Sequence, residues 1–106
     1  MKYFLCRLIP PRPTFAQDMT DVEAKVMGDH AAYWTDLAER GTAIVFGPVA
    51  DPKGTWGVGI LEVEDESVVK SLTSNDPVME HALGATYEIL TMPKIVIGTR
   101  RKVAHG

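Results

Sequence analysis

The chain has 106 residues, of which 45% are hydrophobic and 24% are charged, and its formal net charge at pH 7 is −3. This length suffices for one compact domain, and no apolar run approaches the roughly 18 residues that a membrane-spanning helix needs. The acidic balance lacks the basic face that nucleic acid requires, so we expect neither a membrane nor a nucleic-acid partner.

A first β-strand is predicted over residues 2–9, where alternate side chains face opposite ways. Three prolines end this strand and begin a stiff loop that continues to Asp18. The only cysteine, Cys6, lies in the middle of the strand, which favours a buried, inert thiol over a nucleophile. A lone cysteine forms no intrachain disulfide and favours a reducing compartment, so we expect a cytoplasmic location.

A long helix is predicted over residues 21–40, because Thr20 and Glu23 form a capping box and Gly41 can end the helix. At about 100° per residue, one side of this helix carries an apolar stripe with one imidazole in it. The stripe consists of Val22, Val26, His30, Tyr33, Trp34 and Leu37. An imidazole on a core-facing stripe must find a hydrogen-bond partner or line a cavity. It is also the side chain best suited to proton transfer near neutral pH.

A β-hairpin is predicted next, from a strand over residues 42–46 and another over residues 56–63. Gly47 and Pro48 are expected to end the first of these strands. That strand end either has no further role or exposes backbone N–H groups to an anion or an oxyanion. Trp56, at the start of the next strand, either stacks on a substrate or contacts a second copy of the chain.

A second helix is predicted after Asp65, which can cap it, and a helix restart is predicted at Asp76 and Pro77. Aspartate before proline is typical of a helix N-terminus, so capping alone would account for Asp76. A fourth strand is expected over residues 86–92 and a short fifth over residues 94–98.

The order β-α-β-β-α-β predicts an α+β fold of the ferredoxin-like type with an antiparallel sheet. Two helices cover one face of such a sheet, and an apolar second face needs a partner. That face carries either Trp56, Val58 and Ile60 or the alternate residues Leu61 and Val63. We therefore predict a homodimer that packs sheet against sheet. The domain is expected to span residues 1–98, followed by a basic tail, residues 99–106, that is either solvated or contacts a partner.

Four segments, in this order and in so short a chain, resemble the YCII-related family, a branch of the dimeric α+β barrel group. They are MKYFLCRL at the start, HAAYWTDLAERG from His30, GPVADPKGTWGVGI from Gly47 and NDPVMEHALGATYEILTMP from Asn75. The resemblance extends from Met1 to about Ile97. It implies a small dimer with a His–Asp active-site pair, and these two residues map onto His30 and Asp76.

The family resemblance also points to small-molecule chemistry. At least one relative acts in the breakdown of chlorinated aromatic compounds, and neighbouring families include muconolactone isomerases. This chain departs from the family in having Val78 where an aromatic residue often follows Asp-Pro, and in its longer proline-rich first loop. Both departures lie at the expected wall of the pocket, so the identity of a relative's substrate does not transfer to this chain.

The candidate catalytic residues are therefore His30 and Asp76, and the candidate substrate-binding residues are Trp34, Gly47, Pro48 and Trp56. A histidine in the core bonded to a backbone carbonyl is the plainer alternative for His30, and core packing is the plainer alternative for Trp34. No metal-binding motif is present, and Gly57-Val58-Gly59 is not a dinucleotide fingerprint, so we expect no metal and no cofactor.

Three functional classes remain after these exclusions. The first is a cofactor-independent acid–base enzyme, an isomerase, a lyase or an enzyme of dehalogenating elimination, acting on a small organic substrate of aromatic degradation. The second is a non-catalytic dimeric module that binds or senses a small molecule. The third is an oxygenase of the same barrel group that uses its substrate or a haem as the reactive centre. The first is the hypothesis that a His–Asp pair beside a cavity would favour.

Overall fold

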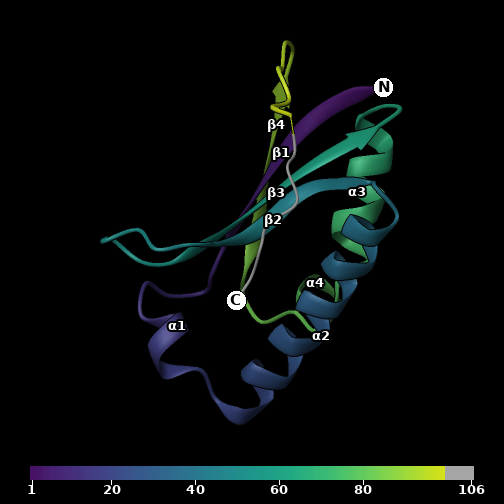
Figure 1. Ribbon diagram of the computed structural model, residues 1–106. Helices are drawn as coiled ribbons and strands as arrows, with labels where there is room; N and C mark the ends of the chain where they lie inside the picture. Colours follow the sequence, from purple (N-terminus) through teal and green to yellow (C-terminus); the bar gives the residue numbers. More distant parts are fainter. Residues whose placement is uncertain (100–106) are drawn as a thin grey trace, which may run out of the picture.

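A four-stranded antiparallel sheet, with its longer helices on one side, forms the body of the molecule in the computed structural model, which describes residues 1–99 (Figure 1). The elements in chain order are β1 (Lys2–Ile9), α1 (Phe15–Asp18), α2 (Asp21–Glu39), β2 (Ala43–Val49), β3 (Trp56–Val63), α3 (Glu66–Ser74), α4 (Pro77–Glu80) and β4 (Thr86–Met92). The strands are ordered β2-β3-β1-β4 across the sheet. The predicted α+β fold of the ferredoxin-like type is confirmed.

The core lies between the sheet and α2, with α3 packed beside it. Alternate residues of β1, namely Phe4, Cys6 and Leu8, are buried on this side, as the period of two predicts. From α2, Trp34 and Leu37 reach the same layer. The centre of the sheet and the middle of α2 therefore share one apolar layer. His30 lies on the side of α2 that faces this layer, so its side chain is directed toward the sheet.

The predicted ends of α2 are confirmed in detail. The Thr20 side chain accepts a hydrogen bond from the Glu23 backbone N–H, and the Glu23 carboxylate accepts one from the Thr20 backbone N–H. Gly41 follows the last turn with a φ of +79°, a conformation that glycine adopts without strain. The N-caps at Asp65 and Asp76 are also present.

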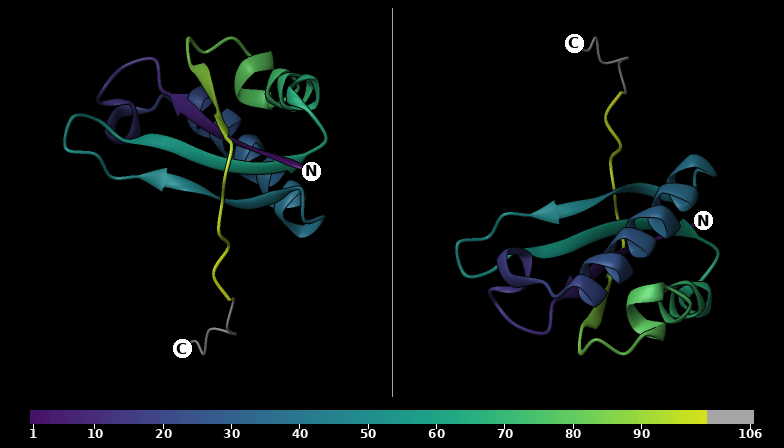
Figure 2. Two further views of the ribbon diagram at one scale, coloured as in Figure 1. Left: turned by 90° about the horizontal axis from the view of Figure 1, so that it is seen from above. Right: turned by 90° about the horizontal axis from the view of Figure 1, so that it is seen from below.

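Three predictions about the helices and strands are wrong. The proline-rich loop contains a short helix, α1, which the buried side chain of Phe15 anchors. β2 does not end at Gly47 and Pro48 but continues to Val49, because β2 is an edge strand and tolerates a proline that has no N–H to donate. No strand forms over residues 94–98, which run away from the sheet after β4 (Figure 2).

One member of the apolar stripe of α2 is also misplaced. Val22 is 69% exposed, because the first turn of α2 extends past the sheet (Figure 1). Helical periodicity predicts the direction of a side chain, but it does not predict how far the neighbouring layer extends.

The second face of the sheet carries no helix within the described residues. Leu61 and Val63 are buried against the helices, so the other face of β3 presents Trp56, Val58 and Ile60. This decides between the two sets that the sequence left open. The basic tail beyond residue 99, with Arg100, Arg101 and Lys102, lies outside the described residues. Within residues 1–99, no helix has both the length and the apolar character that crossing a membrane demands.

Candidate functional site

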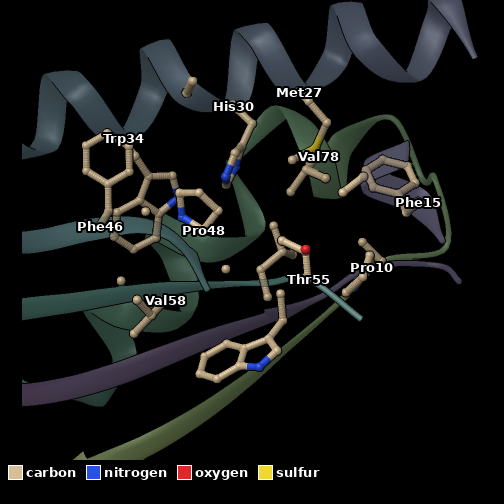
Figure 3. A pocket seen from close by; sticks show the side chains of 18 of the residues that line it. Pro10, Phe15, Met27, His30, Trp34, Phe46, Pro48, Thr55, Val58 and Val78 are labelled. Carbon is tan, nitrogen blue, oxygen red and sulfur yellow. The ribbon is translucent and has the colours of Figure 1, made fainter. Parts of the chain in front are cut away.

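A cavity of about 260 Å³ lies between α2, the sheet and the segment of residues 10–19 (Figure 3). Its walls are mainly apolar and come from α1, α2, β2 and α4. They include the side chains of Phe15, Met27, Trp34, Phe46 and Val78. His30 projects from α2 into the same space (Figure 3).

The imidazole of His30 is bonded on one side and open on the other. Nδ1 lies 2.8 Å from Oδ2 and 3.0 Å from Oδ1 of Asp76. Because an ionised carboxylate only accepts hydrogen bonds, Nδ1 is the donor in this pair. Nε2 forms no hydrogen bond with any of residues 1–99 and faces the cavity, so a neutral His30 presents its free lone pair there.

Asp76 is the polar centre of the site and is fully buried. Its position follows from local sequence, since aspartate before proline forms the N-cap of α4 and accepts from the Val78 backbone N–H at 3.0 Å. The same carboxylate also accepts from Trp34 Nε1 at 2.9 Å and from the Tyr87 hydroxyl at 2.6 Å. With His30 added, four donors from α2, α4 and β4 converge on one side chain. The capping role and the pairing with His30 are therefore compatible.

The electrostatics of the site hold the carboxylate in its charged form. Burial raises the pKa of Asp76, but the hydrogen bonds from His30, Tyr87 and the Val78 backbone outweigh burial, and the pKa lies below its ordinary value. Burial, followed by the charge of Asp76, raises the pKa of Tyr87 well above that of a free phenol. At neutral pH the carboxylate is ionised and the phenol keeps its proton as a donor.

Trp34 has two roles in this site, as a wall of the cavity and as a hydrogen-bond donor, and the sequence suggested only the first. Its ring lines the cavity, and its indole N–H points away to Asp76 and, at 3.0 Å, to the Tyr87 hydroxyl. Because Gly59 has no side chain, the Trp34 ring can lie directly on β3. Trp34 is therefore both part of the wall and part of the polar network.

Gly47 and Pro48 also line the cavity, but not in the way that the sequence suggested. They lie inside β2, with Gly47 opposite Val58 and Pro48 opposite Gly57. The strand end on which the anion-site alternative rested is therefore not at these residues, and Pro48 has no N–H to offer.

Trp56 lies at the border of the cavity, where its ring is held from two sides. Its indole N–H donates to Asp51 Oδ2 at 3.1 Å, and the guanidinium carbon of Arg7 lies 4.5 Å from its ring centroid. The thiol of Cys6 also lines the cavity, and burial raises its pKa to about 12, as befits an inert thiol.

Tyr87 and the wall supplied by α1 were not predicted from the sequence. Tyr87 could have been found, because it alternates with Ile89 on the inward face of β4 and a buried phenol needs a partner. Phe15 gave no comparable signal in a segment that appeared to be a loop. Among residues 1–99, no three His, Cys, Asp or Glu side chains are grouped as metal ligands.

Comparisons with known proteins agree with this architecture. The model of the YCII-related domain family matches residues 1–93. A solved structure with a similar fold is the 5-chloro-2-hydroxyhydroquinone dehydrochlorinase from Burkholderia phenoliruptrix AC1100, in complex with 2,5-dihydroxybenzoquinone. It is 24% identical, has a TM-score of 0.57, and the match covers 81% of this chain and 89% of that one. No curated protein matches the chain in sequence.

Proposed function

This chain belongs to the YCII-related domain family, and from that premise we propose that it is an enzyme that transfers protons on a small organic molecule held beside His30. The observation that carries the proposal is the orientation of the imidazole. Nδ1 is held by the buried Asp76, and Nε2 faces an apolar cavity. A base fixed on one side and free on the other is the arrangement that general acid–base catalysis requires.

In the proposed reaction, Nε2 removes a proton from the bound substrate. The resulting imidazolium is stabilised by the negative charge of Asp76, which also fixes the plane of the ring. In an isomerisation, His30 returns the proton to another atom of the substrate. In an elimination, a double bond forms and the leaving group departs with its bonding electrons, as a halide ion would.

Among these reaction types, the similar solved structure favours elimination. That protein is a dehydrochlorinase of 5-chloro-2-hydroxyhydroquinone, and its ligand is a six-membered ring compound. Elimination from a halogenated ring compound is therefore the first reaction to test on this chain.

The test is halide release from a panel of chlorinated and hydroxylated ring compounds, measured for the wild type and for His30→Ala. One catalytic acid–base group typically contributes about 10²- to 10⁴-fold, so turnover should fall by about that factor. His81→Ala is the matched control, because His81 is exposed on the surface and does not line the cavity. An unchanged kcat in His30→Ala would eliminate this mechanism.

A second candidate function rests on the structural role of the same carboxylate. Asp76 caps α4 and binds Trp34 and Tyr87, so the polar network also stabilises the fold around a ready-made cavity. A dimeric module that binds or senses a small molecule needs only that cavity. Ligands that bind in the panel and are never converted, while His30→Ala binds them equally well, would favour this function.

A further inference from the structure

The cavity beside His30 contains no fixed charge. None of the side chains that line it in the described part of the chain is Lys, Arg, Asp or Glu. Apart from His30, its titratable members are Cys6 and Tyr87, which both stay protonated because burial raises their pKa values. Two guanidinium groups lie against wall residues without lining the cavity themselves. Arg7 lies over the Trp56 ring on the other face of the sheet, with Glu88 4.0 Å away. Arg12 lies over the Phe15 ring and is paired with the carboxylates of Asp18 and Glu23.

The His30–Asp76 pair does not supply a positive charge either. When the imidazole is protonated, the carboxylate 2.8 Å away balances its charge. When the imidazole is neutral, the pair carries the negative charge of Asp76, but this carboxylate is fully buried, does not line the cavity and already accepts hydrogen bonds from four donors. In neither state could the cavity compensate the lost hydration of a carboxylate or a sulfonate, and an isolated buried charge is strongly disfavoured.

The shape and lining of the cavity suit a ring. A cavity of about 150 Å³ with apolar walls is known to accept benzene, and this one, at about 260 Å³, has room for a ring with substituents. Phe15, Trp34 and Phe46 offer aromatic faces and edges from different sides (Figure 3). His30 and Thr55 both direct polar groups into this space (Figure 3).

We propose that this cavity selects uncharged single-ring compounds that carry a hydroxyl or carbonyl group, and that it rejects the same rings when they carry a carboxylate or an ammonium group. The inference rests on the proposed function for the identity of the site and adds the substrate class. The selectivity arises because no side chain that lines the cavity in the described part of the chain is Lys, Arg, Asp or Glu, so a charged substituent would lose its water without gaining a counter-charge.

The test compares three probes of nearly equal outline at pH 7.5 by isothermal titration calorimetry. They are 4-methylphenol, which is uncharged, 4-hydroxybenzoate, which is an anion, and 4-hydroxybenzylamine, which is a cation. We expect 4-methylphenol to bind at least about tenfold more tightly than either charged probe. Equal or tighter binding of a charged probe would overturn the proposal, and so would a failure of 4-methylphenol to bind at millimolar concentration.

A charge placed in the cavity should reverse this preference. Met27 lines the cavity from α2, and Met27→Lys should raise the affinity for 4-hydroxybenzoate relative to 4-methylphenol at least about tenfold. Met27→Gln, of similar length and without charge, is the control and should leave the ratio near that of the wild type. If Met27→Lys does not fold, the pair Ala16→Lys and Ala16→Gln repeats the test from an exposed residue of α1 at the cavity.

These binding measurements are independent of turnover. Selective binding of 4-methylphenol without conversion of any ring compound would contradict the proposed enzyme and leave this inference standing. Turnover of a carboxylated ring that depends on His30 would do the reverse. An unchanged binding ratio in a folded Met27→Lys variant would show that the probes bind elsewhere and would overturn the inference.

Discussion

At the scale of single residues, the site depends on a carboxylate that four donors hold. Asp76 accepts from His30, Trp34, Tyr87 and the Val78 backbone while being fully buried. A buried charge is tolerated only where hydrogen bonds replace its water. The catalytic proposal and the stability of the fold therefore depend on the same side chain, and its removal should affect both.

Asp76→Asn is expected to lower stability at pH 7 by at least about 1–3 kcal/mol, because an amide leaves one or more buried donors without an acceptor. The pKa of Asp76 is lowered in the folded state, so its contribution is complete above the unfolded value of about 3.9 and is lost as the pH falls through the folded value. Thermal unfolding between pH 7 and pH 2 should show a shallower acid limb for the variant. Glu64→Gln, at an exposed carboxylate, is the control. Equal acid limbs in Asp76→Asn and wild type would contradict this prediction.

A second prediction at this scale concerns the contact between β3 and Trp34. A Cβ added at Gly59 would lie 2.4 Å from both Cη2 and Cζ3 of Trp34. The Trp34 ring is buried, and its N–H donates a hydrogen bond to Asp76. Gly59→Ala should therefore destabilise the protein by about 1–3 kcal/mol through overpacking. Gly47→Ala is the matched control, since a Cβ there meets nothing within 4 Å. Similar melting temperatures for the two variants would show that Trp34 can move away at little cost.

At the scale of elements, the position of α1 decides the shape of the cavity. Arg12 joins α1 to the start of α2. Its guanidinium donates two hydrogen bonds to the Glu23 carboxylate, at 2.8 and 2.9 Å. It also donates to the carboxylate and to the backbone carbonyl of Asp18. Its guanidinium also lies over the ring of Phe15, 5.2 Å from the centroid. A bidentate arginine–carboxylate pair fixes orientation as well as distance. The wall formed by Phe15 is therefore held in place from α2.

Arg12→Ala is expected to raise the pKa of Glu23 toward its ordinary value. Hydrogen bonds from Arg12 and from the Thr20 backbone lower that pKa to about 2, and the contribution from Arg12 is the largest. The stabilisation linked to Glu23 is present above its unfolded pKa and is lost as the pH falls toward 2, so the variant should lose this part of its acid dependence. NMR titration of the Glu23 side chain measures the shift, and hydrogen exchange in residues 15–18 should become faster.

The control for this experiment is Arg40→Ala. Arg40 forms an exposed pair with Asp36 one turn away on the same helix, far from α1 in sequence. Its removal should change neither the Glu23 titration nor exchange in α1. A Glu23 pKa that stays near 2 in Arg12→Ala would show that the capping box alone accounts for the shift.

At the scale of the whole molecule, the uncovered face of the sheet is the feature that a single chain leaves unexplained. Leu90 of β4 and Val45 of β2 are about half exposed there, at 49% and 47%, beside Trp56 and Ile60 of β3. A face of this composition needs a cover. We predict that this cover is a second copy of the chain, packed sheet against sheet.

Sedimentation should give a dimer at micromolar concentration, because an obligate interface typically buries on the order of 2,000 Å² or more. Leu90→Arg should shift the protein toward the monomer, since it places a charge in the predicted interface. Val22→Arg is the matched control, because Val22 is an exposed apolar residue on α2 and not on this face. A monomeric wild type, or equal effects of both variants, would refute the packing of sheet against sheet.

The sequence by itself determined the features that depend on neighbours along the chain. The strands β1, β3 and β4, the capping box of α2 and the aspartate caps of α3 and α4 are readable because alternation, helical period and capping involve residues a few positions apart. The inward direction of His30 belongs to the same group. Its pairing with Asp76 was suggested by family resemblance, since periodicity alone does not relate residues 46 positions apart.

Only the tertiary structure decided which groups meet. Trp34 and Tyr87, 53 positions apart, share one hydrogen bond and one carboxylate because β4 lies beside β1 and α2 crosses above them. Tertiary packing also explains three differences from the sequence-based predictions. β2 continues through Gly47 and Pro48, α1 forms where Phe15 is buried, and Val22 remains exposed. Each of these outcomes depends on whether an element lies at the edge or under cover. Position at an edge or under cover is a property of the assembled layers. It decides the outcome because the free energy of burying an apolar side chain exceeds the differences in helix propensity between ordinary residues.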